Sequence, residues 1–334
     1  MIDFRSDTVT KPTKEMRDIM YSAPVGDDVY GDDESVNNLE HFAITRFNCE
    51  AALFCSSGTQ ANLLALMAHC ERGDEYICGQ NAHNYKFEGG GAAVLGSIQP
   101  QPIENELNGT LNFKQIAAAI KPDDSHFAKT RLLSLENTIG GKVLSLKYLA
   151  QARNFVNEHN LALHLDGARA FNASTELKVD IKEITTHFDS VSICLSKGLG
   201  APVGSLLLGS STLINKARRW RKVLGGGMRQ AGMLAAAGQY ALENNVNRLK
   251  DDHANARYLA ESLSALKGFN VDMSNTTNMV YASYVEDFNI ADIAQNLKQQ
   301  GILISPSKQL RLVTHLGITQ KDIDTFINAL SAHV

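Results

Sequence analysis

Short apolar strands alternate with helices along most of this 334-residue chain, and this alternation constrains the fold more than any other feature. Between strands predicted at 161–165 and 190–195, apolar residues from Leu177 to Phe188 recur every three or four positions, which indicates a connecting helix. The pattern predicts an α/β fold with a mainly parallel central sheet flanked by helices. The other strands of this sheet are predicted near 51–54 and at 75–78, 131–135 and 205–208.

The last part of the chain has a different pattern, with shorter elements after one long helix predicted at 238–266. It predicts a smaller C-terminal α+β domain, with strands at 279–284, 302–304 and 310–313 and helices at 290–300 and 319–333. The first residues are polar and interrupted by proline, so they are expected to dock elsewhere as an arm. We therefore expect an arm at 1–20, a large domain at 21–245 and a small domain at 246–334.

The composition argues against nucleic acid or a membrane surface as the partner. The 32 basic and 36 acidic residues are spread along the chain and give a formal net charge of -4, so no basic field attracts polyanions. A small-molecule substrate is the expected partner. The five cysteines lack paired CxxC spacing and are expected to be reduced thiols. Because the sequence has no apolar signal segment or membrane-spanning run, a cytoplasmic location is expected.

The segment SVSICLSKGLG, residues 190–200, places Lys197 directly after a predicted strand. Ligands of open α/β sheets bind at the carboxyl ends of the strands. A lysine that is desolvated there loses its proton more readily and becomes a possible nucleophile. Taken alone, this lysine can equally be a solvated cation in a loop.

Two further polar residues are predicted at the same edge of the sheet. Asp166 ends the strand in LALHLD, and Arg169 follows it in DGAR. The simpler interpretation is that Asp166 pairs with Arg169 in a structural salt bridge. The functional interpretation is that Asp166 contacts a ligand beside Lys197.

A phosphate site is predicted where Ser57, Gly58 and Thr59 open a helix after the strand that ends at Phe54. The N–H groups and the positive end of the helix dipole at such a position bind anions. The alternative is an ordinary helix cap made by Ser57 or Thr59.

A lysine, a carboxylate and a phosphate site at one sheet edge match the needs of pyridoxal phosphate. Lys197 would form a Schiff base with the cofactor aldehyde, and Asp166 would keep the ring nitrogen protonated so that the ring accepts electrons. His83, in QNAHNY after the strand at 75–78, is the candidate to face the ring.

Arginines are the candidates for binding the carboxylate of an amino-acid substrate, because a guanidinium binds a carboxylate through two hydrogen bonds. Arg169 and Arg311, the latter in QLRLVTH, are possible partners, although each can serve in a salt bridge instead. The basic segment KARRWRKVLGGGMR, 216–229, is interpreted mainly as a solvated helix face. Arg229, after the three glycines, is the candidate to reach an anion across a subunit boundary.

Together these motifs resemble the low-specificity L-threonine aldolases, pyridoxal phosphate enzymes of the aspartate aminotransferase fold type. The resemblance covers nearly the whole chain and implies cleavage of L-threonine, L-allo-threonine and related β-hydroxy-α-amino acids to glycine and an aldehyde. The segments that carry it are RSDTVTKPT, VGDDVYGDD, SSGTQANL, AHNYKFEGGGAAVLG, LHLDGAR, CLSKGLGAPVGSLL, GGGMRQAG and RLVTHL.

The resemblance also implies the roles of individual residues. The catalytic residues would be Lys197, His83 and His126, the two histidines lying near the substrate β-hydroxyl. The cofactor would be bound by Ser57, Gly58, Thr59, His83, Asp166, Arg169, Lys197 and Arg229. The substrate carboxylate would be held by Ser6, Arg169 and Arg311, and no metal is expected. The chain would form a homo-oligomer, a dimer or a tetramer, with shared active sites.

One position departs from the family pattern. The family usually has ENTH where this chain has ENTI, so Ile139 replaces an imidazole near the site, and substrate preference or rate is expected to differ.

Three other functions stay open. The same scaffold supports other pyridoxal phosphate reactions: transamination, β-elimination or racemisation. A dinucleotide-binding oxidoreductase is a poorer fit, because GLGAPVG at 198–204 misplaces the third glycine of GxGxxG. A catalytically silent protein of this fold, acting as an interaction module, is the third.

Overall fold

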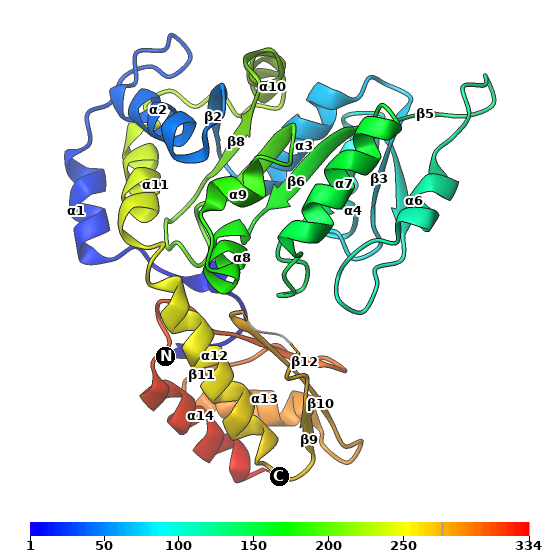
Figure 1. The fold of residues 1–334 in the computed structure, drawn as a ribbon. Coiled ribbons are helices and arrows are strands. Elements are labelled where there is room, and N and C mark those ends of the chain that lie inside the picture. Colours follow the sequence, from blue (N-terminus) through cyan, green and yellow to red (C-terminus); the bar gives the residue numbers. More distant parts are fainter. Residues whose placement is uncertain (275–276, 334) are drawn as a thin grey trace.

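The computed structural model describes residues 1–274 and 277–333, which form a large part and a smaller part joined end to end (Figure 1). A seven-stranded sheet with the order β2-β8-β7-β6-β5-β3-β4 lies at the centre of the large part. All neighbouring strands are parallel except β8, which runs antiparallel to both β2 and β7. The prediction of a mainly parallel α/β sheet is confirmed. The strands are β2 (Ala51–Cys55), β3 (Asp74–Gly79), β4 (Gln99–Ile103), β5 (Lys129–Glu136), β6 (Ala162–Gly167), β7 (Ser190–Cys194) and β8 (Ser205–Gly209).

Helices cover both faces of this sheet because successive strand residues point to opposite sides. On β2, Leu53 packs in a core with α3 (Gly58–His69) and α10 (Ser211–Val223), whereas Phe54 packs in the core on the other face. That second face is covered by α2 (Glu34–Phe47), α7 (Leu146–Glu158), α8 (Ala170–Leu177), α9 (Ile181–Thr185) and α11 (Gly232–Asn244). The short helices α4 (His83–Lys86), α5 (Gly91–Val94) and α6 (Phe113–Ala119) lie in the connections around β3, β4 and β5.

The smaller part has its own hydrophobic core between an antiparallel sheet and three helices. The strand order is β12-β10-β9, and a two-stranded pair, β1 and β11, lies beside it. This confirms the predicted smaller α+β unit. Its elements are α12 (Leu249–Ser264), β9 (Phe269–Val271), β10 (Met279–Tyr284), α13 (Ile290–Gln299), β11 (Ile302–Leu303), β12 (Leu310–Val313) and α14 (Gln320–Ser331).

The N-terminal segment contacts both parts. Its first strand, β1 (Ile2–Asp3), pairs in parallel with β11, and Phe4 belongs to the core of the smaller part. The following helix, α1 (Lys14–Ser22), packs against α11 of the large part. The segment between them therefore crosses the boundary beside the carboxyl ends of the central strands.

Two predicted helices are each divided into two separate helices in the structure. The helix predicted at 238–266 is divided into α11 and α12, and Asn245 in the break donates from its side-chain amide to the backbone oxygen of Leu199 over 2.7 Å. The helix predicted from 177 to 188 is divided into α8 and α9 at Lys178, whose φ of 57° ends α8 in the left-handed region. Asp180 then starts α9 with a capping box.

The strand β4 was not predicted because QPQPI contains two prolines. Proline removes a backbone donor and is tolerated mainly in edge strands. The structure agrees with this rule, since β4 lies at the end of the sheet and pairs with β3 alone.

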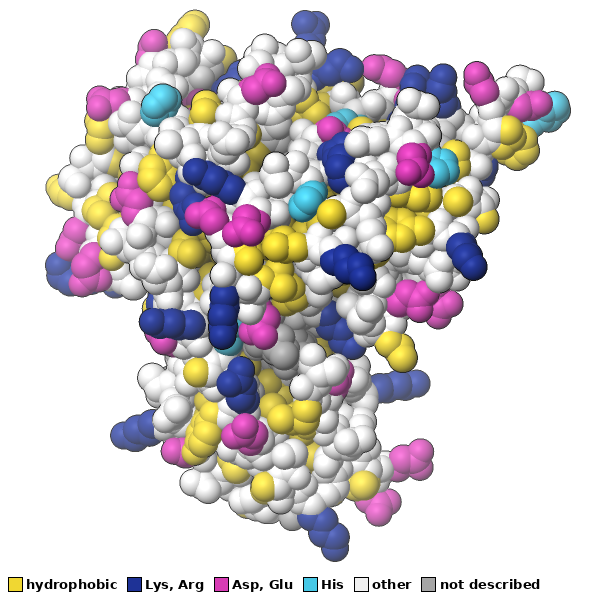
Figure 2. Space-filling view, in the orientation of Figure 1, with side chains coloured by type: hydrophobic (Ala, Val, Ile, Leu, Met, Phe, Trp, Pro, Cys, Tyr) yellow, Lys and Arg dark blue, Asp and Glu magenta, His cyan; other side chains and the backbone are white. Residues whose placement is uncertain are grey.

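The surface carries charges of both signs. Figure 2 shows Lys and Arg side chains interspersed with Asp and Glu over both parts on the visible face. The five cysteines are free thiols, and four of them are buried. Within the described part of the chain, no helix has both the length and the apolar character that a membrane span requires.

Candidate active site

A cavity of about 1030 Å³ lies between the two parts, at the carboxyl ends of the central strands. Residues of the N-terminal segment, the large part and the smaller part line it together. Among the predicted site residues, the structure brings five to this cavity: Ser6, His83, Arg169, Lys197 and Arg311.

Lys197 reaches the cavity because β7 ends three residues before it. The chain then turns through Gly200, which has a φ of 79° that favours glycine. The Thr10 hydroxyl donates to the backbone oxygen of Lys197 over 3.2 Å, so the N-terminal segment fixes this turn. The amine is thus presented at the sheet edge where the sequence places it.

Arg169 pairs with a carboxylate that the sequence did not suggest. Its Nε and Nη2 atoms donate to the two carboxylate oxygens of Asp7 at 2.8 and 2.6 Å. Burial alone would raise the pKa of the fully buried Asp7, but the guanidinium outweighs burial and lowers it to about 2. The simpler interpretation of an Asp166–Arg169 salt bridge is therefore wrong, because the guanidinium of Arg169 forms its two hydrogen bonds with Asp7.

Asp166 accepts hydrogen bonds from neutral donors instead. Its Oδ2 accepts from the side-chain amide of Asn62 over 2.7 Å, and its Oδ1 accepts from the backbone N–H of Ala168 over 3.0 Å. Asp166 is the next-to-last residue of β6 and is buried, and Asn62 lies within α3. None of the contacts just described neutralises its charge.

His83 is held by two carboxyl groups. Its Nδ1 lies 2.8 Å from an oxygen of Glu88, and its backbone N–H donates to Glu136 over 2.8 Å. The hydrogen bond with Glu88 raises the pKa of His83 above its usual value, because the imidazolium is favoured beside a carboxylate. A histidine positioned in this way can accept a proton from a bound molecule.

The carboxyl groups around the cavity make it a favourable place for a cation. Ligand atoms of His83, Glu88 and Asp166 all lie within 4.8 Å of one another. Burial raises the pKa of Glu88, and burial together with the nearby Asp166 raises the pKa of Glu136 to about 8. A positively charged ring nitrogen would relieve this repulsion.

The predicted phosphate site lies at the start of α3, directly after β2. Ser57 is the helix cap, since its Oγ accepts from the backbone N–H of Gln60 over 3.1 Å, so the cap interpretation is correct for this residue. A Cβ added at Gly58 would meet no atom within 4 Å, so the space beside the first turn is open. The N–H groups of Gly58 and Thr59 belong to that turn, where helical donors lack intrahelical acceptors.

Six predicted residues do not line the cavity within this chain: Ser57, Gly58, Thr59, Asp166, His126 and Arg229. His126 lies on the segment between α6 and β5, which projects away from the body in Figure 1, and its side chain is 82% exposed. Arg229 pairs with Asp27 over 2.7 Å and lies over the ring of Tyr30. The interpretation of 216–229 as a solvated face is also wrong for Arg221, which is buried and pairs with Asp28 at 2.6 Å.

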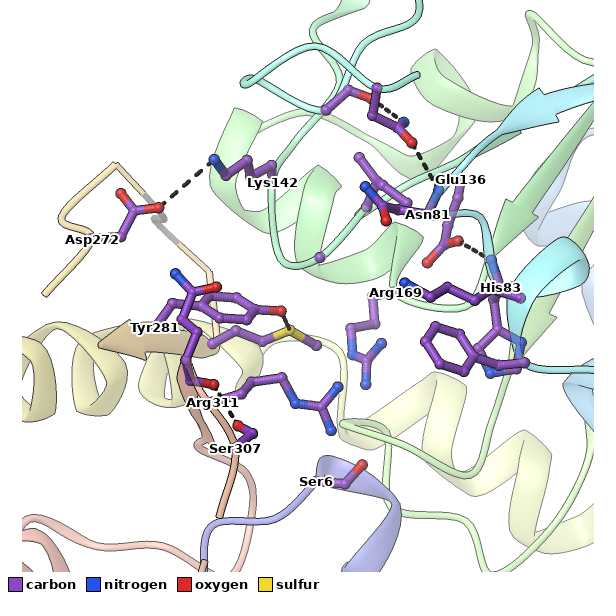
Figure 3. A pocket seen from close by; sticks show the side chains of 18 of the residues that line it. Ser6, Asn81, His83, Glu136, Lys142, Arg169, Asp272, Tyr281, Ser307 and Arg311 are labelled. Carbon is purple, nitrogen blue, oxygen red and sulfur yellow. Dashed lines mark hydrogen bonds and ion pairs between the residues drawn. The ribbon is translucent and has the colours of Figure 1, made fainter. Parts of the chain in front are cut away.

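The side of the cavity nearest the smaller part can bind an anion. Figure 3 shows the guanidinium groups of Arg169 and Arg311 and the hydroxyl of Ser6 converging on one region. Arg311 is held by a hydrogen bond from its Nη2 to the backbone oxygen of Arg5, at 3.1 Å. Two arginines without a second carboxylate between them suit a substrate carboxylate.

Ile139 lines the cavity and is only 8% exposed. The lining also includes the apolar Leu107 and Met279 and the charged Glu106 and Lys142. The residue that departs from the family pattern therefore does lie at the site.

Four residues around this site were missed in the sequence: Asp7, Asn62, Glu88 and Glu136. Asn62 left a usable signal, because it is a polar residue inside the apolar helix GTQANLLALMAH and must find buried partners. The three carboxyl groups lie in a single 3-10 turn, in a loop and at a strand end, where no periodic pattern separates them from solvated acids.

Comparison with known proteins identifies the family. The family model described as "Beta-eliminating lyase" matches residues 3–285. The low specificity L-threonine aldolase of Escherichia coli K12 is 57% identical over 323 residues, covering 97% of this chain and 96% of the relative. Low-specificity L-threonine aldolase 1 of Arabidopsis thaliana is 43% identical over 333 residues, covering 96% and 93%.

A solved structure confirms the fold over the whole length. The threonine aldolase of Leishmania major superposes with a TM-score of 0.85, at 21% identity and 99% coverage of both chains. With the fold, the position of Lys197 and the sequence matches in agreement, the chain belongs to the β-eliminating lyase family and, within it, to the pyridoxal phosphate-dependent low-specificity L-threonine aldolases.

Proposed function

We propose that this protein cleaves L-threonine, L-allo-threonine and related β-hydroxy-α-amino acids to glycine and an aldehyde. One observation carries the proposal most directly: a lysine, a carboxylate-bound histidine and two arginines face a single cavity. These are the groups needed to attach an amino acid, to hold its carboxylate and to remove a hydroxyl proton.

The residues present fit the cofactor of this family. Lys197 would carry it, Asp166 would face its ring nitrogen, and the first turn of α3 with Ser57, Gly58 and Thr59 would bind its phosphate. Pyridoxal phosphate supplies an aldehyde that binds the amino group covalently and a protonated ring that accepts the electron pair of the broken bond. The open space at Gly58 and the crowded carboxylates near His83 both favour such a group.

The substrate carboxylate is assigned to Arg169, Arg311 and Ser6. Asp7 occupies Nε and Nη2 of Arg169, which leaves its Nη1 atom for the substrate. By fixing the carboxylate, these residues would orient the substrate and so select which bond at Cα is cleaved when the cofactor is bound.

His83 is assigned as the base. It takes the proton of the β-hydroxyl, directly or through a water, as the Cα–Cβ bond breaks and the β-carbon leaves as an aldehyde. A proton then returns to Cα and gives glycine. Glu88 favours the protonated imidazole, which is the form produced in this step.

His126 and Arg229 keep their assigned roles only if another copy of the chain supplies them. We propose a homo-oligomer, a dimer or a tetramer, in which the exposed segment that carries His126 reaches a neighbouring cavity and Arg229 lies near a neighbouring phosphate site. Light scattering of the purified protein measures the number of subunits. Mixing a Lys197→Ala chain with a His126→Ala chain then tests sharing, because partial recovery of activity requires sites built from two chains.

We also propose the division into an arm (1–20), a large domain (21–245) and a small domain (246–334), and a cytoplasmic location. The separate hydrophobic core of the smaller part favours the division, and the free thiols favour a reducing compartment. Limited proteolysis of the full chain would test the boundary at 245–246.

The deciding experiment combines a spectrum with product analysis. The purified protein is reconstituted with pyridoxal phosphate, mixed with L-threonine, and assayed for glycine and acetaldehyde. We expect both products in equal amounts from the wild type and neither from Lys197→Ala. Lys250→Ala, on the exposed face of α12, is the matched control and should keep full activity. From L-threonine, 2-oxobutanoate with ammonia would instead indicate elimination, 2-oxo-3-hydroxybutanoate would indicate transamination, and a changed configuration at Cα alone would indicate racemisation.

The position of Ile139 at the cavity bears on substrate preference. Ile139→His introduces the imidazole usual in the family, and comparing kcat/KM for threonine and for a β-aryl substrate in both proteins would show whether this residue selects the β-substituent.

A further inference from the structure

A buried chain of polar side chains leads away from Asp166 through the core of the large part. The Asn62 amide donates to Asp166 over 2.7 Å, and the Asn62 Oδ1 lies 3.3 Å from Nε2 of His164. The Nδ1 of His164 lies 2.8 Å from the Ser190 hydroxyl, which lies 2.8 Å from Nε2 of His69. Asp166, Asn62, His164 and Ser190 are each at most 2% exposed, so water does not compete for these hydrogen bonds.

The direction of every hydrogen bond in this chain follows from the carboxylates beside Asn62 and from the neutral state of His164. The amide nitrogen of Asn62 must face Asp166 and Glu88, since an amide oxygen there would repel both carboxylates. Its oxygen therefore accepts, and His164 must donate from Nε2. A neutral His164 then has an unprotonated Nδ1, which accepts from the Ser190 hydroxyl. Ser190 in turn accepts from Nε2 of His69.

His164 is neutral because burial lowers its pKa to about 3. All donors therefore point toward Asp166, and hydrogen bonds aligned in one direction polarise and strengthen one another. The Ser192 hydroxyl adds a second donor to the Asn62 oxygen at 2.7 Å. Asn62 then uses both N–H donors and both lone pairs, so its orientation is fully determined.

The chain ends beside a second cavity. His69 closes α3 and lines a cavity of about 590 Å³ at the amino ends of β6 and β7, which is the sheet edge opposite Lys197. The polar chain thus runs along the strands, from the carboxyl end of β6 to the amino ends of β6 and β7. The roles assigned above to the residues of the first cavity do not account for this polar chain.

We propose that His164 is a positioning residue which, through Asn62, fixes the carboxylate of Asp166 as a hydrogen-bond acceptor for the ring nitrogen of the cofactor. The proposal rests on the proposed role of Asp166. Asp166 has no cationic partner among the residues that contact its two oxygens here, so aligned neutral donors stabilise its charge. That charge then stays available to hold a proton on the ring.

The test uses holoenzyme reconstituted with pyridoxal phosphate that carries ¹⁵N in the ring. For His164→Leu we expect the ¹⁵N resonance to move toward its unprotonated position and the affinity for the cofactor to fall about tenfold. Affinity for an analogue with carbon in place of the ring nitrogen should stay unchanged. His164→Gln, which can again donate to Asn62, should restore most of the shift.

Control variants distinguish the role of His164 from the proposed role of Asp166 at the ring nitrogen. Ser205→Ala removes a buried hydroxyl that donates to the backbone of Ile193 outside the chain, and it should alter neither measurement. Ser190→Ala breaks the same chain with a smaller change in volume, and it provides the test if His164→Leu does not fold. Equal loss of affinity for cofactor and analogue overturns the proposal, because the role is then only structural. The proposal is also overturned if the ring ¹⁵N resonance stays in place in His164→Leu and Ser190→Ala but shifts in Asp166→Asn. If the resonance stays in place in Asp166→Asn as well, the proposed role of Asp166 is wrong, and the role of His164 is wrong with it.

Discussion

Asp7 and Asp166 are buried carboxylates beside the same cavity, but the protein treats their charges differently. Asp7 comes from the N-terminal segment and meets a guanidinium in a two-point salt bridge, whereas Asp166, near the end of a central strand, accepts from an amide and a backbone N–H. The charge of Asp7 is neutralised inside the protein and that of Asp166 is not. We infer that Asp7 stabilises the structure and that the charge of Asp166 is available to a cationic ligand.

The largest expected effect comes from Asp166→Asn. An amide keeps the shape but cannot stabilise a protonated ring, so kcat/KM for threonine should fall about a thousandfold. Urea unfolding of the cofactor-free protein should change little. Steady-state kinetics measure the loss of activity, and unfolding curves on the same preparation measure stability. Near-normal activity in this variant would mean that the charge of Asp166 is not needed for the reaction.

The converse change, Asp7→Asn, should act on stability. It leaves Arg169, whose side chain is only 11% exposed, without its carboxylate, which costs about 3 to 5 kcal/mol of unfolding free energy. The pKa of Asp7 is lowered to about 2, so its contribution is present above the ordinary value of 3.8 and is lost as the pH falls toward 2. Urea unfolding at several pH values measures it. Asp18→Asn, from an exposed pair with Lys14, is the control and should change little.

Glu88→Gln removes the carboxylate that is hydrogen-bonded to His83. Without the carboxylate the pKa of His83 should fall, and kcat/KM should fall about ten- to a hundredfold because the base is less well positioned. The acidic limb of the pH–rate profile should move to lower pH. An NMR titration of His83 tests the shift directly, and an unchanged titration would mean that Glu88 does not control this imidazole.

The smallest expected effect concerns Glu136, whose pKa is raised to about 8 by burial and by Asp166. The folded state binds a proton here that the unfolded state releases above about 4.5, so this group lowers stability as the pH rises toward 8. Glu136→Gln should therefore stabilise the cofactor-free protein by about 1 to 2 kcal/mol at pH 8 and hardly at pH 5. Thermal melts at both values are sufficient, and equal gains at both would contradict the assignment.

Much of the fold could be predicted from the sequence because strand and helix periods are local. The strands leading to Lys197 and Asp166 were located within one or two residues, and these positions define the site. The division between α11 and α12 could not be predicted, since Asn245 interrupts the helix through a contact with Leu199, which is 46 positions away.

The site was less predictable than the fold for the same reason. Lys197, His83 and Arg311 were identified from motifs, and they do line the cavity. The partners that define their chemistry come from distant segments: Asp7 lies 162 positions from Arg169, and Asn62 lies 104 positions from Asp166. Their pairing follows from three-dimensional packing, which a single sequence does not encode in any local pattern.

The pairing of β1 with β11 has a consequence for synthesis of the protein. Ile2 pairs with Ile302, so the strand that leaves the ribosome early must wait for a partner translated about three hundred residues later. The tether that carries Asp7 to Arg169 is therefore anchored on the smaller part only near the end of translation. A chain that ends before Ile302 contains every strand of the central sheet but lacks the β1–β11 pair that holds the N-terminal segment beside the cavity.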